Sequence, residues 1–220
     1  MSGPHEKNKL ANKRKMMLEA QLNSRGISDA AVLRAMNEVP REEFVPRELK
    51  HFAYYDGPLS IGAGQTISQP YIVALMTECL RLNKDCDVLE IGTGCGYQTA
   101  ILAKLCREVF TIERIESLGN EAKQRLESLG FSNIKFYIGD GSCGWYEKRK
   151  FDRILLTAAA EDMPEPLLEQ LAEGGIAVGP FGGFAFQQLV AIEKTRGKII
   201  RTPICGCRFV RLIGEYGYSQ

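Results

Sequence analysis

The chain has 220 residues, of which 45% are hydrophobic and 25% charged, and its formal net charge at pH 7 is +1. This length predicts one large domain, or one domain with a small appendage. A nearly neutral chain gives no electrostatic reason to expect a nucleic-acid or membrane partner. No apolar stretch of the sequence is long enough to cross a bilayer.

The seven cysteines are odd in number and scattered along the chain, which indicates reduced thiols and a cytoplasmic protein. Cys205 and Cys207 are the nearest approach to a metal-binding pair. One residue separates them, and no second pair of ligands lies nearby in the sequence, so we predict no metal site.

The first sixty residues predict a disordered leader followed by a helical cap. Residues 1–8 are the leader, and 9–22 form a charged helix with an irregular apolar face. Ser28-Asp29 is typical of a helix N-cap and predicts a second helix over 29–38, which Pro40 ends. Residues 9–60 are therefore the N-terminal cap of a single domain whose α/β core spans 61–220.

Residues 61–70 predict a loop that leads into a helix from Pro70 to about residue 82. The loop contains two glycines and two hydroxyl side chains, Thr66 and Ser68. Ser68 lies close to the start of the helix, so capping of its first turn explains this residue as well as a functional role does.

Residues 88–100 contain three apolar residues and Glu90, then Gly92, Gly94 and Gly96, then a helical pattern. This order predicts a strand, a tight turn and a helix. The glycines permit positive φ angles and close approach of a ligand, and the turn brings that ligand to the positive end of a helix. Such ligands bind at the carboxyl ends of parallel strands.

The glycine spacing differs from the G-x-G-x-x-G of dinucleotide-binding folds. It resembles the first motif of the S-adenosylmethionine-dependent methyltransferases. A second strand over 109–113 ends in Glu113, about 20 residues past the first glycine, where an acid can accept from ribose hydroxyls. Another doubly wound enzyme with a glycine-rich turn is the alternative.

The α/β alternation continues with strands at 108–113, 134–138 and 151–157 and with helices at 116–129 and from Pro164 to about 172. Asp140, between Gly139 and Gly141, could reach an adenine amine, although a plain Asp-Gly turn explains it too. Residues 158–160 are alanines that leave room for a substrate or fill space compactly.

After Gly174-Gly175, which should end the last helix, strands are predicted at 175–178, 187–193, 199–204 and 209–216. No helix separates the last three, so they should be antiparallel strands at the sheet edge. We therefore expect an α/β fold: a doubly wound, Rossmann-like methyltransferase sheet with antiparallel C-terminal edge strands and an N-terminal helical cap.

The chain resembles the protein-L-isoaspartate O-methyltransferase family of repair enzymes. The likeness lies in residues 26–46, 61–71, 88–103 and 139–141 with 151–152, and more weakly in 208–212. The Thr66-Ile67-Ser68 stretch is the most diagnostic part, because general methyltransferases lack it. The chain departs from the family at Arg211, where proline is common, and at Cys95, where serine or alanine is frequent.

The resemblance implies S-adenosyl-L-methionine as cofactor, isoaspartyl-containing proteins and peptides as partners, and a monomer. It implies Ser68 as the catalytic residue. The implied cofactor-binding residues are Thr66, Ile67, Ser68, Glu90, Gly92, Thr93, Gly94, Gly96, Tyr97, Gln98, Thr99, Glu113, Arg114, Gly139, Asp140 and Gly141. The implied substrate-binding residues are Ile61, Ser68, Ala159, Phe209 and Val210.

The implied acceptor is the free α-carboxylate of an L-isoaspartyl residue, whose pKa of about 3–4 leaves it ionised at neutral pH. It needs no general base, so Ser68 suits the role of a hydrogen-bond donor that orients one oxygen. Three alternatives remain: a methyltransferase with a small-molecule or RNA acceptor, a non-catalytic binding module, and, disfavoured by the glycine spacing, a nicotinamide dehydrogenase.

Overall fold

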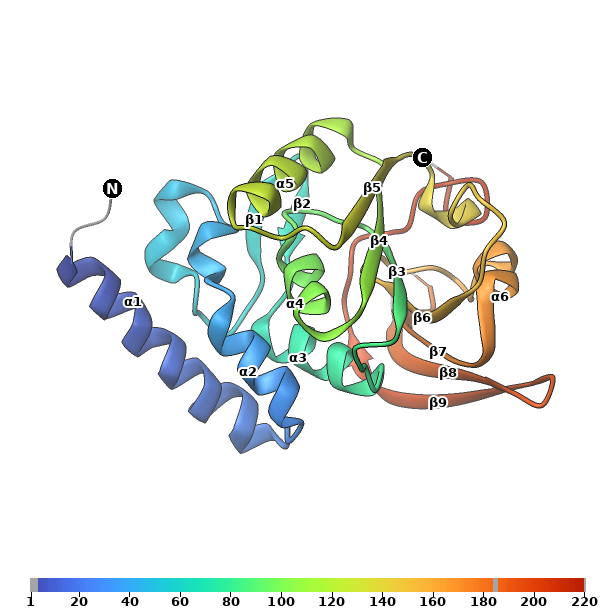
Figure 1. Cartoon of the computed structure of the whole chain (residues 1–220), viewed down its shortest axis with the longest axis horizontal. Helices are drawn as coiled ribbons and strands as arrows, with labels where there is room; N and C mark the ends of the chain where they lie inside the picture. The colour runs from blue at the N-terminus through green and yellow to red at the C-terminus, as the bar shows by residue number, and fades with distance from the viewer. Residues whose placement is uncertain (1–3, 184–185, 220) are drawn as a thin grey trace.

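The computed structural model describes residues 4–183 and 186–219 (Figure 1). Its centre is a seven-stranded sheet with the strand order β5-β4-β3-β6-β7-β8-β9. The strands are β3 (Asp87–Ile91), β4 (Glu108–Glu113), β5 (Ile134–Ile138), β6 (Phe151–Leu156), β7 (Leu171–Phe181), β8 (Gln187–Thr195) and β9 (Lys198–Cys207). Strands β3 to β7 are parallel, whereas β8 and β9 are antiparallel. The predicted doubly wound sheet with antiparallel edge strands is confirmed.

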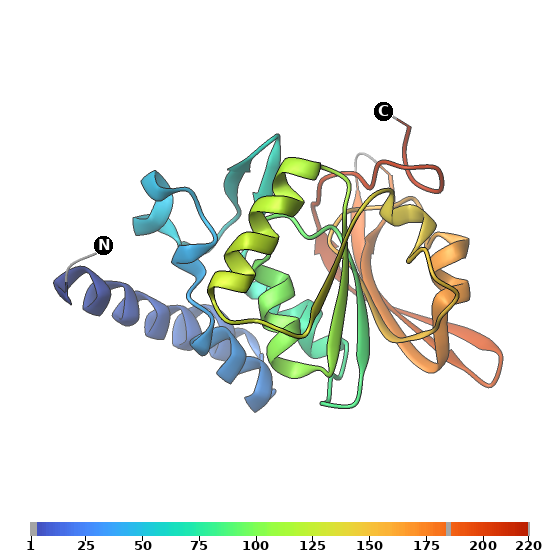
Figure 2. The ribbon, with the colours of Figure 1, turned by 45° about the horizontal axis from the view of Figure 1, so that its top comes forward.

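Helices cover both faces of the sheet (Figure 2). They are α3 (Pro70–Cys79), α4 (Tyr97–Leu105), α5 (Glu116–Ser128) and α6 (Glu165–Gln170). Successive side chains of a strand point to opposite faces. Val88 packs with residues of α3 and α4, whereas Leu89 packs with Leu167 of α6. Because both faces are buried, β3 is buried along its whole length, as a central parallel strand should be.

The N-terminal region is a helical cap, as expected. It consists of α1 (Pro4–Met17), η1 (Leu18–Leu22), η2 (Asn23–Arg25), α2 (Ala30–Glu38), η3 (Arg41–Glu43) and η4 (Arg47–Phe52). Asp29 caps α2, since its Oδ1 accepts from the backbone N–H groups of Ala31 and Val32 at 2.7 and 3.1 Å. The cap shares one apolar cluster with α3 and α4, so it belongs to the same core.

The prediction of a disordered leader over residues 1–8 is wrong for residues 4–8, which form the first turns of α1. Proline is favoured at the start of a helix because its fixed φ suits the first turn. Residues 1–3 lie outside the described residues. The predicted loop at 61–70 also contains a hairpin, β1 (Leu59–Gly62) with β2 (Gln65–Ile67), so the predicted division after residue 60 falls inside β1.

Two further predictions near the C-terminus are wrong. Gly174-Gly175 does not end a helix: α6 ends at Gln170, and these glycines lie within β7 beside a register irregularity of its pairing with β6. The segment 209–216 is not an edge strand. Ala159 donates to the carbonyl of Val210 and accepts from the N–H of Leu212, both at 2.7 Å. This pairing directs the segment across the carboxyl end of the sheet.

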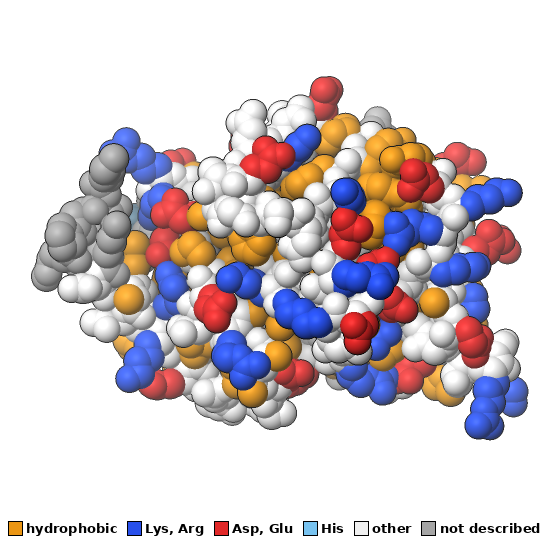
Figure 3. Space-filling model, in the orientation of Figure 1, with side chains coloured by type: hydrophobic (Ala, Val, Ile, Leu, Met, Phe, Trp, Pro, Cys, Tyr) orange, Lys and Arg blue, Asp and Glu red, His pale blue; other side chains and the backbone are white. Residues whose placement is uncertain are grey.

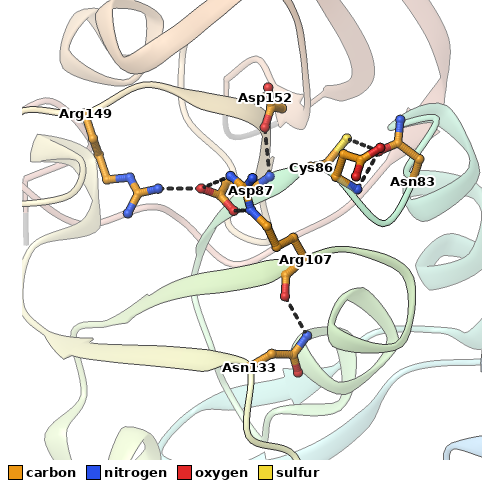
Figure 4. Close-up of polar contacts among 8 residues, drawn as sticks. Asn83, Cys86, Asp87, Arg107, Asn133, Arg149 and Asp152 are labelled. Atoms are coloured by element: carbon orange, nitrogen blue, oxygen red, sulfur yellow. Dashed lines mark hydrogen bonds and ion pairs between the residues drawn. The ribbon is translucent and has the colours of Figure 1, made fainter.

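The amino ends of the parallel strands carry a charged cluster centred on Asp87 (Figure 4). Asp87 accepts from Arg107 Nε at 2.8 Å and from Arg149 Nη2 at 2.6 Å, while its backbone N–H donates to Asp152. Arg149 also lies over the ring of Phe110, at 3.8 Å from the centroid. This cluster stabilises the amino ends of the central strands, opposite the glycine-rich turn.

The surface carries both signs of charge. On the face shown in Figure 3, acidic and basic side chains are interspersed. No helix among the described residues is long and apolar enough to cross a membrane.

Candidate active site

Three neighbouring cavities lie at the carboxyl ends of β3, β4 and β6, and Thr66 and Thr157 line all of them. The large cavity has a volume of about 370 Å³ and the small cavity about 50 Å³. The third cavity has a volume of about 270 Å³. Gly94 borders the large and small cavities, and Ser68 borders the small and third cavities. The glycine-rich turn and the Ser68 loop therefore face a shared space.

The conformation of the turn after β3 explains its glycines. Gly92 has φ +97°, and a Cβ there would overlap Thr157 Oγ1, which donates to the carbonyl of Gly92 at 2.6 Å. Gly96 has φ +88°, and a Cβ there would press on Leu126. Around Gly94 the space is open apart from Ile61. Gly92 and Gly96 thus permit close packing, whereas Gly94 leaves a wall of bare backbone beside the cavities.

Glu113 ends β4 and borders the large cavity together with Arg114. Its Oε2 accepts from the N–H of Gly94 at 2.8 Å, and its Oε1 accepts from the N–H of Ile115 at 2.9 Å. A carboxylate oxygen has more than one lone pair, so both oxygens can accept further bonds from ligand hydroxyls. Ile91, Ile112, Ile115 and Leu212 contribute apolar side chains to the wall of this cavity. A carboxylate acceptor beside apolar side chains fits a nucleoside, whose ribose donates hydroxyls and whose base is flat and apolar.

Glu90 lies beneath the turn and is not among the residues that border the three cavities. Its Oε2 accepts from Thr99 Oγ1 at 2.6 Å and from Thr111 Oγ1 at 2.7 Å. The hydroxyl of Thr93 lies 2.7 Å from that of Thr111 and thereby ties the turn to the same network. Burial raises the pKa of Glu90 to about 8. Glu90 and Thr99 thus support the turn from below, and their contact with the cofactor stays a prediction.

Asp140 also holds backbone instead of facing a cavity. Its Oδ1 accepts from the N–H of Ser142 at 2.8 Å, and its Oδ2 accepts from the N–H of Glu215 at 2.7 Å. These hydrogen bonds hold the pKa of Asp140 below its usual value, although burial opposes them. Gly141 borders the large cavity, whereas Gly139 and Asp140 do not. Asp140 thus fastens the C-terminal segment over the turn that follows β5.

Ser68 does not cap α3. Gln69 is the N-cap residue, and no side chain completes the cap. No hydrogen bond of the Ser68 hydroxyl occurs among the described residues, while its carbonyl accepts from Arg41 Nη2 at 2.8 Å. Ser68 borders the small cavity with seven other predicted cofactor residues: Thr66, Ile67, Gly92, Thr93, Gly94, Tyr97 and Gln98. Capping therefore does not explain Ser68, and its functional role stays a prediction.

Of the other predicted substrate residues, two border a cavity and two do not. Phe209 and Val210 border the third cavity, and paired hydrogen bonds with Gln187 hold the backbone of Phe209. Ile61 approaches the position of a Gly94 Cβ at 3.6 Å but borders none of the three cavities. Ala159 is fully buried and holds the segment around Val210 through one backbone hydrogen bond to Val210 and one from Leu212.

Sequence reasoning missed Thr157 and the segment 206–208. Thr157 follows β6 at its carboxyl end, which is where polar residues of a parallel sheet meet a ligand, so its position gave a usable signal. Residues 206–208 border the third cavity because β9 ends there. Their position depends on the order of the strands in the sheet, which local sequence patterns do not reveal.

A glycine turn at the end of a central parallel strand, an acid at the end of the next strand and an apolar cavity between them define an S-adenosylmethionine-dependent methyltransferase. Residues 12–217 match the family model "Protein-L-isoaspartate(D-aspartate) O-methyltransferase (PCMT)". The chain belongs to this family.

Relatives and solved structures agree with this assignment. The chain is 54% identical to a protein-L-isoaspartate O-methyltransferase of Dictyoglomus turgidum, over 94% of both chains. It is 51% identical to that of Geobacter metallireducens, over 94% of this chain and 96% of the relative. One solved protein-L-isoaspartate O-methyltransferase has a TM-score of 0.82 at 30% identity and covers 93% of this chain and 67% of its own. A second solved structure, a "putative protein-L-isoaspartate O-methyltransferase" from Plasmodium falciparum in complex with S-adenosyl-L-homocysteine, has a TM-score of 0.79 at 29% identity. The match covers 91% of this chain and 98% of the other.

Proposed function

We propose that the chain transfers a methyl group from S-adenosyl-L-methionine to the free α-carboxylate of L-isoaspartyl residues in proteins and peptides. The methyl ester then converts through a succinimide toward a normal aspartyl residue. The observation that carries this proposal is the shared border of the small cavity, where Ser68 and Gly94 both lie, in a chain whose residues 12–217 match the family. We further propose that the protein is cytoplasmic and acts as a monomer. Light scattering tests the monomer, whose mass would be that of one chain, 24.5 kDa.

The residues around the large cavity suit the cofactor. Bare backbone at Gly94 and the N-terminus of α4 would hold its amino-acid end, because the helix dipole favours a carboxylate there. Glu113 would accept from the ribose hydroxyls, and the isoleucine side chains with Leu212 would enclose the base. When bound, the cofactor supplies a methyl group activated by a positively charged sulfur.

Ser68 would act on the acceptor. Its hydroxyl has no partner among the described residues, so it is available to donate to one oxygen of the substrate carboxylate. The other oxygen is then left to attack. Alignment of reacting atoms in this way can contribute several kcal/mol, up to about 7–11. Losing the Ser68 hydrogen bond should remove about 1–3 kcal/mol, which is roughly a 5- to 150-fold loss of rate.

Paired peptides test the proposal. Each pair has one sequence and contains either L-isoaspartyl or L-aspartyl at one position, and methyl transfer is followed by mass spectrometry. We expect labelling of the isoaspartyl peptide alone, and Ser68→Ala should lower the rate while calorimetry gives an unchanged cofactor affinity. Equal labelling of both peptides would contradict the proposed acceptor. A Ser68→Ala enzyme with full activity would contradict the role of Ser68.

A further inference from the structure

Arg41 is a fully buried arginine in the N-terminal cap, at the start of η3. Its side chain is not on the surface of the cap but extends toward the core. Nε donates to the carbonyl of Ala53 at 2.7 Å, and Nη2 donates to the carbonyl of Ser68 at 2.8 Å. The guanidinium thus joins the cap to the very residue that is proposed to orient the substrate.

The same guanidinium contacts the helix that follows the glycine-rich turn. It lies over the ring of Tyr97, with 4.9 Å between the guanidinium carbon and the ring centroid. Tyr97 is the first residue of α4, and it borders the small cavity together with Ser68. Arg41 therefore touches both walls of that cavity, the wall on the glycine side and the wall on the Ser68 side.

Holding Arg41 in this place is costly. No carboxylate among the described residues forms an ion pair with it, and its Nη1 is buried without a hydrogen-bond partner. Burial disfavours the charged form of the guanidinium and thereby lowers the pKa of Arg41. A buried charge without a counter-ion destabilises the folded state. A cap that needed only packing at this position would be better served by an apolar side chain.

The rigid fork of an arginine fixes the directions of its N–H groups in a way that the single ammonium of a lysine cannot. Here it fixes the peptide of Ser68 relative to Tyr97, across a cavity of only about 50 Å³. We propose that Arg41 is a positioning residue for methyl transfer, which holds the Ser68 backbone so that its hydroxyl faces the substrate carboxylate. This inference rests on the proposed role of Ser68.

A double-mutant cycle tests it. In Arg41→Met the packing volume is kept but both hydrogen bonds are lost, and kcat/KM for the isoaspartyl peptide at saturating cofactor should fall about 10- to 100-fold. Cofactor affinity measured by calorimetry should stay within about twofold, because Arg41 is not among the residues that border the large, small and third cavities. Arg41→Lys, which keeps the charge and can reach one carbonyl, should lose less. In a Ser68→Ala background, Arg41→Met should lower kcat/KM less than about threefold further, since no hydroxyl is left to orient.

Arg14→Met is the matched control. Arg14 joins the same cap through Tyr54 and Glu42, at 2.7 and 3.0 Å, and borders none of the three cavities. It should lower the denaturant midpoint and leave kcat/KM within about twofold. If Arg41→Met does not fold, the same cycle is run with Arg41→Lys.

The outcomes separate the two proposals. If Ser68→Ala keeps full activity, the role of Ser68 fails, and the inference for Arg41 fails with it. If Ser68→Ala is impaired but the effect of Arg41→Met is equally large in both backgrounds, only the inference for Arg41 is overturned. A fall in kcat/KM that Arg14→Met reproduces would also overturn it, because loss of cap stability would then explain the result.

Discussion

Replacing Glu90 with glutamine is expected to change how the stability of the protein depends on pH. Burial, partly offset by hydrogen bonds from Thr99 and Thr111, raises the pKa of Glu90 from 4.5 to about 8. Between these pH values the unfolded chain loses the proton of this carboxyl, whereas the folded protein keeps it. The folded state therefore binds more protons, and the free energy of unfolding decreases as the pH rises through this window.

The size of the effect follows from the pKa change. Each pKa unit corresponds to about 1.4 kcal/mol, so the full change from 4.5 to about 8 costs the folded protein up to about 5 kcal/mol above pH 8. Glu90→Gln has no proton to lose, and its amide oxygen can accept from the same two hydroxyls. The two proteins should differ by about 1 kcal/mol or less at pH 5, and the variant should be more stable by several kcal/mol at pH 9.

Urea unfolding of the cofactor-free proteins, followed by circular dichroism between pH 5 and 9, measures this difference. Thr99→Val is the companion variant: it removes one of the hydrogen bonds that lower the pKa of Glu90, so its stability should keep falling to higher pH. A difference between Glu90→Gln and the original protein that stays constant with pH would refute the reasoning. If the variant instead becomes less stable than the original protein as the pH rises, Glu90 is ionised in the folded state.

Three more predictions concern the surroundings of the site. Asp87→Asn breaks two ion pairs whose arginine side chains are 61% and 27% exposed, so it should lower the free energy of unfolding by about 1–3 kcal/mol in urea titrations, with kcat unchanged because Asp87 lies at the opposite end of β3 from the glycine-rich turn. Gly92→Ala forces a Cβ against Thr157 and strains a positive φ, so calorimetry should show cofactor affinity reduced more than about tenfold. Asp140→Ala should release the C-terminal segment, seen as faster hydrogen exchange at the amide of Glu215, and the original protein should show the same loss as the pH falls below the depressed pKa of Asp140.

The regular elements could be predicted because their signals are local. The apolar run of β3 and the glycine that follows α5 mark their boundaries without any knowledge of neighbours. The errors arose where long-range pairing decides the structure. Residues 209–216 have the composition of a strand, but their backbone pairs with Ala159 over the end of the sheet. Gly174 marks a positive φ, which suits a helix end and a strand irregularity equally well.

The same distinction applies to the site. Glu113 could be placed because it ends a strand next to the glycine turn. The direction in which the Glu90 side chain points could also be predicted from the sequence. Side chains alternate along β3, so Glu90 lies on the same face of the sheet as Val88, beneath α4. Arg41 could not be identified, because an arginine in a short turn is normally exposed, and only the folded structure brings it to Ser68.

The side chains around the small cavity bear on the choice of acceptor. Burial raises the pKa of Tyr97 to about 12 and also raises the pKa of Cys95, so both stay protonated at neutral pH. The other described side chains there are hydroxyls, an amide and apolar groups, none of which is a base at neutral pH. An alcohol acceptor would need such a base to lose its proton. A carboxylate arrives already ionised and needs only orientation, which is what a hydroxyl such as that of Ser68 can provide.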